Sequence, residues 1–368
     1  MASFSTRRTR TTRMLAAGAV LGLAALSLSA CSGDSSADAS GDGNVGVSLI
    51  VKTTTNPFFV SMQDGAKKAA ETSGVDLKLA AGKSDGDEAT QIQAIENAIS
   101  DGDKGILITP NGPSVVDALK KARDAGLYVI ALDTPPDPAD AADITFATDN
   151  FAAGEQIGQW TAEKLDGKKA VIGMVDLFDD KIVSVDYTRD QGFLTGMGID
   201  AADDKVNGDE AKSGKYTGGK GGDYEIAGNQ ASQGAEDGGR TAMETLLAGN
   251  PDINVVYTIN EPAAAGAYEA LKAAGKEKDT LVVSIDGGCS GVSNVKQGII
   301  DATAQQYPVK MAELGVEAIT KLAETGEKPE TTEGLDFFNT GSKLVTEEKM
   351  SGVESIDAAE ASKICWGK

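Results

Sequence analysis

The stretch VGVSLIVKTTTNPFFV, residues 45–60, decides the fold. Its first part, Val45 to Val51, is an apolar run typical of a buried strand, and the polar turn Lys52 to Asn56 follows it. Pro57 then takes the first position of an expected helix, where the N–H that proline lacks would have no helical partner. Ligands of open α/β sheets bind beyond the carboxyl ends of the strands. This turn therefore predicts a ligand site.

Two aromatic residues, Phe58 and Phe59, come directly after the turn. Their flat apolar faces suit the C–H faces of a sugar ring, and Lys52 and Asn56 offer hydrogen bonds to its hydroxyls. The alternative is that both rings are core residues beneath a helix cap. This stretch alone leaves both interpretations open.

Outward from this stretch, short apolar runs alternate with helical patterns. This alternation predicts βαβ units and parallel sheets, in two halves of similar pattern. The expected strands are Val45–Lys52, Val75–Ala80, Gly105–Thr109, Tyr128–Leu132, Ile144–Ala147, Ala170–Val175, Asn254–Thr258, Leu281–Ile285, Ile300–Gln305 and a piece near Leu335–Phe338. The expected helices are Pro57–Thr72, Asp87–Ile99, Pro113–Ala125, Asn150–Leu165, Tyr187–Met197, Ala235–Ala248, Pro262–Ala274, Ser290–Gln297 and Pro308–Ala323.

The segment Asp200–Asp223 is polar and rich in glycine, and we expect it to be a loop insertion. Within it, Gly214–Lys220 has the spacing of a phosphate loop. No apolar strand precedes this motif, and Gly221 stands where the Mg²⁺-binding hydroxyl is needed, so we do not expect nucleotide binding. The acid cluster Asp200–Asp204 has no recognisable series of Ca²⁺ ligands. We therefore expect no metal and no cofactor.

The first thirty residues have the pattern of a secretory signal. Four arginines precede the apolar run Met14–Ala30, so we assign 1–30 to a signal peptide. Leu28–Cys31 resembles a lipoprotein lipobox, which implies cleavage before Cys31 and a lipid on its sulfur. Residues 31–44, small and acidic, would then be a flexible tether to the outer face of the cell membrane. An ordinary signal peptide is the alternative, and the Sec and Tat export routes both stay open.

The net charge is −22, and without the four signal arginines 30 basic residues stand against 56 acidic ones. Such an acidic chain is not expected to bind nucleic acid. There is no histidine, which excludes the usual Ser–His and Cys–His catalytic sets and most zinc sites. With Cys31 lipidated, Cys289 and Cys365 form an even pair in an oxidising compartment, so we predict a disulfide; two free thiols are the alternative.

Polar residues recur at the expected carboxyl ends of the strands. Together they would form a ring of carboxylates, amides and one guanidinium that faces the two phenylalanines. Each one alone is more often a helix cap or a loop residue. The set is Asp133, Arg189, Asn260, Glu261, Asp286, Gln305 and Gln306.

At this point the chain resembles a known family, the periplasmic sugar-binding proteins of ABC transporters, in the ribose-binding branch. The motifs run in the family's order over roughly Val45 to Ala323. They are NPFF (Asn56–Phe59), LDT (Leu132–Thr134), ATDN (Ala147–Asn150), TRDQGF (Thr188–Phe193), IDGG (Ile285–Gly288) and QQYP (Gln305–Pro308). Within this family, the chain most resembles the members that bind fructose. Three features carry this resemblance: Lys52, DGGC (Asp286–Cys289) and CWG (Cys365–Gly367).

The resemblance implies a role for each matching residue. Phe58 would stack on the sugar with Phe59 beside it, and Lys52 would add a donor that ribose binders lack. Thr134 stands where those binders carry arginine, and Gln233 or a neighbour replaces a second stacking aromatic, so both departures count against ribose. Hydrogen bonds to the hydroxyls would come from Asn56, Asp133, Arg189, Asn260, Asp286 and Gln306.

The implied fold is α/β, with two Rossmann-like lobes whose parallel sheets are joined by a three-strand hinge, the type I periplasmic binding protein. Residues 45–148 plus 307–338 would form the N-terminal lobe, and 149–306 plus 339–368 the C-terminal lobe. A monosaccharide, with fructose favoured, would bind between them and pass to a membrane permease. We expect a monomer and no enzyme. The alternatives are a sugar sensor that feeds a receptor, and a hydrolase with Asp133 and Asp286 as a carboxylate pair.

Overall fold

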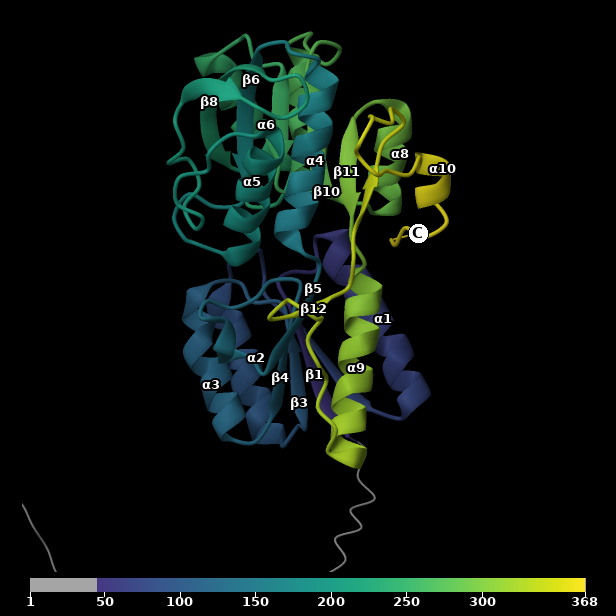
Figure 1. Cartoon of the computed structure of the whole chain (residues 1–368). Helices are drawn as coiled ribbons and strands as arrows, with labels where there is room; N and C mark the ends of the chain where they lie inside the picture. Colours follow the sequence, from purple (N-terminus) through teal and green to yellow (C-terminus); the bar gives the residue numbers. More distant parts are fainter. Residues whose placement is uncertain (1–44, 368) are drawn as a thin grey trace, which may run out of the picture. The chain divides into compact units, whose positions relative to one another are not determined.

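The computed structural model describes residues 45–367. The expected signal peptide 1–30, the tether and the lipid site at Cys31 lie outside the described residues. The described chain contains two sheets, each covered by helices on both faces (Figure 1). Among these residues, no helix combines the length and the apolar character needed to cross a membrane.

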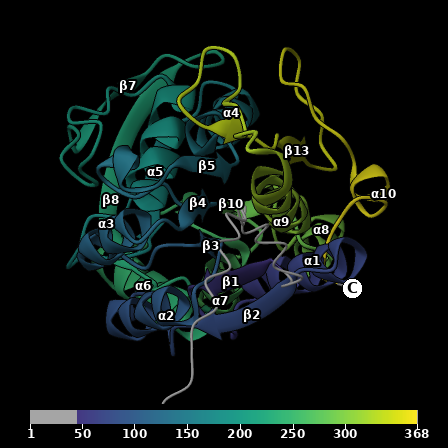
Figure 2. The ribbon, with the colours of Figure 1, turned by 90° about the horizontal axis from the view of Figure 1, so that it is seen from below.

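The first sheet has six strands in the order β12-β5-β4-β3-β1-β2, and all its neighbours run parallel. One face packs against α1 and α9, which lie side by side (Figure 2), and the other against α2 and α3. The strands are β1 (Gly46–Val51), β2 (Asp76–Ala81), β3 (Gly105–Ile108), β4 (Tyr128–Leu132), β5 (Ile144–Ala147) and β12 (Phe338–Asn339). The helices are α1 (Pro57–Ser73), α2 (Glu88–Asp101), α3 (Val116–Asp124) and α9 (Pro308–Thr325), with 3₁₀ turns at Pro113–Val115 and Ala139–Ala141.

The second sheet has seven strands in the order β13-β11-β10-β9-β6-β8-β7, and only its two edge strands run antiparallel to their neighbours. Helices α4 and α5 cover one face, and α6, α7 and α8 the other. The strands are β6 (Ala170–Asp176), β7 (Ser213–Tyr216), β8 (Gly222–Ala231), β9 (Val255–Thr258), β10 (Leu281–Asp286), β11 (Ala302–Gln305) and β13 (Lys343–Val345). The helices are α4 (Asn150–Leu165), α5 (Ser184–Met197), α6 (Glu236–Gly249), α7 (Glu261–Ala273), α8 (Cys289–Gln297) and α10 (Ala358–Ala361).

The chain passes between the two sheets three times. It leaves β5 through 148–149 to reach α4, leaves β11 through 306–307 to reach α9, and leaves β12 through 340–342 to reach β13. This arrangement confirms the expected α/β fold of two halves joined by three connections.

The expectation that Asp200–Asp223 is only a loop is wrong. It contains β7 and leads into β8, which pairs in parallel with β6. These strands lie at the edge of the sheet, where few side chains are buried, so their sequence is mostly polar. Tyr224 and Ile226, buried at alternate positions of β8, were the available signal. The short elements β13 and α10 were also missed, and α5 begins at Ser184 rather than at Tyr187.

The predicted disulfide between Cys289 and Cys365 is confirmed. It joins the start of α8 to the C-terminal tail, and the backbone N–H of Cys289 also donates to the carbonyl of Trp366. The tail is therefore fixed beside the second sheet. The indole of Trp366, however, packs in the core of the first half.

Candidate functional site

A narrow cavity lies where side chains from both halves meet. Most of the residues expected to bind a ligand line it together: Lys52, Asn56, Phe58, Phe59, Asp133, Arg189, Asn260, Asp286 and Gln306. Asp85, Leu177, Val185 and Ile259 complete the wall. Thr134 and Gln233, the two departures from the ribose pattern, do not line this cavity.

Arg189 stands at the centre of the site, with a side chain only 5% exposed. Its Nε donates to Asn150 Oδ1 at 2.8 Å, and its Nη1 donates to the carbonyl of Ile259 at 2.9 Å. Its guanidinium also lies 3.5 Å from Asp133 Oδ1 and 4.0 Å from Asp286 Oδ1. A single buried cation thus stands between two carboxylates that come from the two sheets.

Glycines on α4 explain how α5 brings Arg189 to this place. A Cβ at Gly154 would lie 2.2 Å from the carbonyl oxygen of Arg189, and one at Gly158 would lie 2.2 Å from that of Phe193. Only glycine therefore permits the two helices to pack this closely. Arg189 lies deeper in its helix than the expected start at Tyr187 implies, because α5 begins at Ser184, five residues before Arg189.

The two carboxylates are held in unusual backbone conformations. Asp133 has φ +63° and Asp286 has φ +144°, regions that residues with a Cβ adopt rarely and at a cost of about 1–3 kcal/mol. The hydroxyl of Thr134 donates to Asp133 Oδ2 at 2.8 Å, and Gln306 Nε2 donates to Asp286 Oδ1 at 2.8 Å. Thr134 therefore contacts Asp133 and orients it.

Burial raises the pKa of Asp286 to about 6, while the Arg189 guanidinium acts in the opposite direction. Among the described residues, three buried oxygens of the residues that line the cavity have no hydrogen-bond partner: Asp85 Oδ1, Asp133 Oδ1 and Gln306 Oε1. Buried polar atoms without a partner are uncommon in folded proteins. All three can accept, and a bound molecule with hydroxyl groups could donate to them.

The aromatic residues belong to the site and to the core at once. Phe58 and Phe59 are 3% and 4% exposed, and they meet edge to face with their centroids 5.3 Å apart. Phe58 makes a second edge-to-face contact, also at 5.3 Å, with Trp366. The indole N–H of Trp366 donates to the carbonyl of Gln306 at 2.8 Å. The two interpretations of these phenylalanines, core and ligand contact, are therefore compatible.

The two asparagines of the site both cap helices. Asn56 Oδ1 accepts from the N–H of Phe58 at the start of α1, and Asn260 Oδ1 accepts from that of Ala263 at the start of α7. Asn260 Nδ2 also donates to the carbonyl of Gly234. The amide of Asn260 is thus occupied within the protein, and a ligand would have to share it.

The sequence analysis did not name three residues that lie near the site as ligand contacts. Asn150 holds Arg189, and Trp366 supports Phe58 from the tail. Asp85 lines the cavity; burial raises its pKa and the Lys52 ammonium opposes that rise. Asn150 closes the ATDN motif, and Trp366 lies in the CWG motif, so motif membership was the signal available for both.

The free space at the centre is about 30 Å³, room for about two water molecules rather than a sugar ring. A neighbouring cavity of about 730 Å³ shares Asn56, Asp85 and Asp286 with it and is also lined by Gln233 and Trp366. Entry of a ligand as large as a monosaccharide therefore requires the lining residues to move apart.

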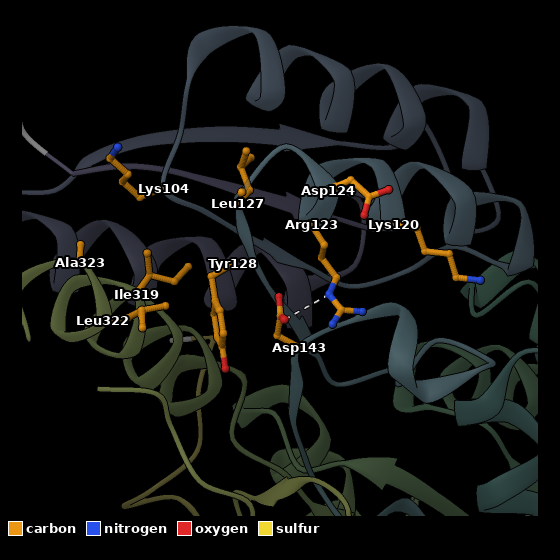
Figure 3. Close-up of a pocket in the computed structure, with 11 residues that line it drawn as sticks. Lys104, Lys120, Arg123, Asp124, Leu127, Tyr128, Asp143, Ile319, Leu322 and Ala323 are labelled. Carbon is orange, nitrogen blue, oxygen red and sulfur yellow. Dashed lines mark hydrogen bonds and ion pairs between the residues drawn. The ribbon is translucent and has the colours of Figure 1, made fainter. Parts of the chain in front are cut away.

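Another cavity, of about 540 Å³, lies at the amino ends of β3, β4 and β5 (Figure 3). Two of its charged groups pair with each other: Arg123 Nε donates to Asp143 Oδ1 at 3.1 Å, and Asp143 Oδ2 accepts from the N–H of Val129. Burial raises the pKa of Tyr128 to about 12, so its hydroxyl stays protonated. The carboxyl ends of the strands thus hold the better candidate site.

Two α/β halves with three connections, and a polar cavity lined from both, define the architecture of a two-lobed binding protein. Residues 47–328 match the periplasmic binding protein domain. The ribose import binding protein of Salmonella typhimurium is 30% identical over 79% of this chain and 88% of its own. The D-apiose import binding protein of Actinobacillus succinogenes is 29% identical over 86% and 90%. A solute-binding protein structure from Agrobacterium vitis with bound D-fucose is 26% identical, covers 87% of this chain and 99% of its own, and has a TM-score of 0.70.

The chain therefore belongs to the periplasmic binding protein family. This confirms the family expected from the motifs. The greater similarity to fructose-binding members stays a prediction, because the ribose, apiose and fucose proteins all match at comparable identity.

Proposed function

We propose that this chain is the solute-binding component of an ABC importer and takes one monosaccharide, with fructose favoured, into the cavity around Arg189. The observation that carries the proposal is a set of buried acceptors without a hydrogen-bond partner, Asp85 Oδ1, Asp133 Oδ1 and Gln306 Oε1, beside two aromatic rings. Sugar hydroxyls would donate to these acceptors, and a wrong epimer would leave them unpaired. The relatives named for ribose and apiose import support this class of ligand.

Closure of two lobes completes the proposed mechanism. Residues 45–148 with 307–338 would move as one lobe, and 149–306 with 339–368 as the other, about the three connections. Asp133 from one lobe and Arg189 from the other would then enclose the sugar between them. The closed form would present both lobes to a permease, with no chemical step and no cofactor.

Calorimetric titration of residues 45–368 with a panel of monosaccharides tests this function. We expect one sugar to bind tightly and the Arg189→Ala variant to lose at least about 100-fold in affinity, because Asp133 and Asp286 would lose their shared cation. Arg240→Ala, an exposed change on α6, is the matched control and should bind normally. The absence of binding by every sugar of the panel, or normal binding by Arg189→Ala, would contradict the proposal.

We also propose export, cleavage before Cys31 and a lipid on that cysteine, so that the monomeric binding domain is tethered to the outer face of the membrane. The apolar run before Cys31 supports this proposal. Labelling of expressing cells with a fatty-acid analogue should mark the wild-type protein and not the Cys31→Ala variant. Equal labelling of both would refute it.

A further inference from the structure

A second group of buried oxygens lies in the second half of the chain, around Asp190 on α5. Each of its members has at least one buried side-chain oxygen without a hydrogen-bond partner among residues 45–367. We call it the oxygen cluster, and its residues are Asp176, Asp190, Gln191, Asn207, Glu210 and Asn229. They come from the end of β6, from α5, from the insertion and from β8.

Contacts among these residues bring them to one place. Asn229 Nδ2 donates to Asp176 Oδ2 at 3.0 Å, and Asp176 and Asp190 lie within hydrogen-bond reach of each other. The insertion closes over them: Gln191 Nε2 donates to the carbonyl of Val206 at 2.9 Å. A Cβ built on Gly208 would lie 3.2 Å from the amide of Asn229. The insertion therefore covers the cluster instead of extending into solvent.

The unpaired atoms of the cluster are all acceptors. Asp190 is fully buried and neither of its oxygens has a partner, and Glu210 is 3% exposed with Oε2 unpaired. Lys212 contacts only the other oxygen of Glu210, at 3.3 Å. The hydroxyl of Tyr257, fully buried near Asp190, has no partner either within the described part of the chain. Facing oxygens repel one another unless a proton, a water molecule or a cation lies between them.

Burial and the neighbouring Asp186 carboxylate raise the pKa of Asp176 to about 8, and burial and the Asp176 carboxylate raise that of Asp190 as well. A divalent cation would remove both the repulsion and the missing hydrogen bonds at once. A surface cavity of about 430 Å³ reaches Asp176, Asn207 and Asn229, and it provides an entry route.

We propose that the oxygen cluster binds Ca²⁺, with the carboxylates of Asp176 and Asp190 as charged ligands and the amide oxygen of Asn229 beside them. Gln191 on α5 and Asn207 in the covering segment would supply further amide oxygens. In the described chain, no three or more His, Cys, Asp or Glu side chains are arranged to hold a metal. The proposed site therefore depends on amide oxygens as well as carboxylates, a mixture that suits Ca²⁺ rather than zinc.

The bound cation would join α5 to the insertion and to β8. Arg189 is the neighbour of Asp190 on α5, so the ion would also hold the helix that carries the proposed sugar contact. This gives the insertion a function that does not depend on which sugar binds.

The test uses residues 45–368, freed of metal with EDTA and titrated with CaCl₂ at pH 7.5. We expect one binding event in calorimetry and an upward shift of the melting temperature. Both should be lost in Asp190→Asn, which keeps the shape of the side chain and removes its charge. Asp203→Asn, in the exposed acid cluster of the same insertion, is the matched control and should respond like the wild type.

A wild-type protein that is folded by circular dichroism but gives no heat and no thermal shift with CaCl₂ would overturn the proposal. An unchanged response in Asp190→Asn would overturn it too, and a response to MgCl₂ of equal size would overturn the assignment to Ca²⁺. If Asp190→Asn fails to fold, Asp176→Asn serves instead and should weaken Ca²⁺ binding. These readouts need no sugar, so their failure is distinct from failure of the proposed transport function.

Discussion

Arg189 and Asp190 are neighbours on α5, yet they belong to two different buried environments. Around Arg189, the carboxylates Asp133 and Asp286 share a guanidinium that the chain itself supplies. Around Asp190, the carboxylate of Asp176 and several amide oxygens meet, and no ion pair to Asp176 or Asp190 is present among residues 45–367. The comparison shows that a buried carboxylate alone does not identify a site, because the group that compensates its charge decides what can bind there.

The largest expected effect is on the free energy of unfolding, which should respond differently to changes at Arg189 and at Asp190. Arg189→Ala should lower the free energy of unfolding by about 3–5 kcal/mol, because it leaves two buried carboxylates without their cation. Asp190→Asn, measured without Ca²⁺, should not lower it, because it removes a buried charge that no cation compensates. Urea unfolding at pH 7.5 with EDTA measures both. An equal loss of unfolding free energy in the two variants would contradict the difference between the two environments.

A smaller effect is expected at the aromatic wall of the cavity around Arg189, which Phe58 and Phe59 form. Phe58→Ala should weaken sugar binding by about 1–3 kcal/mol, because it removes contact area between ring and sugar. Phe146 is equally buried in the same core, outside the cavity, so Phe146→Ala should cost stability without changing the affinity of the folded protein. Calorimetric titration with the identified sugar measures both variants. Unchanged affinity in Phe58→Ala would remove that ring from the site.

A third effect, spread over two pH units, concerns a carboxyl that lies near neither Arg189 nor the oxygen cluster. Burial raises the pKa of Asp301 to about 6 against an ordinary value of 3.8. The folded state therefore holds this proton more tightly than the unfolded state, so its contribution to stability falls as pH rises from about 4 to 6 and is constant above that. The whole change amounts to at most about 3 kcal/mol.

Asp301→Asn should lack this fall, because an amide does not titrate, while its oxygen can still accept from the N–H of Val282 as the carboxylate does. Urea unfolding at pH 4, 5, 6 and 7 compares the variant with the wild type. Parallel curves for the two proteins would show that Asp301 titrates normally in the folded state.

Residues at the ends of apolar strands could be predicted from the sequence. Asp133 and Asp286 follow buried runs whose ends are visible in the hydrophobic pattern, and parallel strands bring those ends to one edge. The oxygen cluster could not be predicted in this way. Asn229 lies on β8, the strand next to the edge strand β7, and the polar sequence of β8 hides it; Glu210 lies in a segment with no periodicity. Their proximity to Asp190 is a property of the tertiary fold.

The contact between Trp366 and Phe58 also sets an order of events in time. Trp366 follows Phe58 by 308 residues, and it is the partner that fixes one face of that ring. A ribosome or an export channel delivers the chain from its amino end, so Phe58 emerges long before the tail that supports it. The aromatic wall is thus assembled only after almost the whole described chain has emerged, and a chain still in transit cannot carry a finished sugar site.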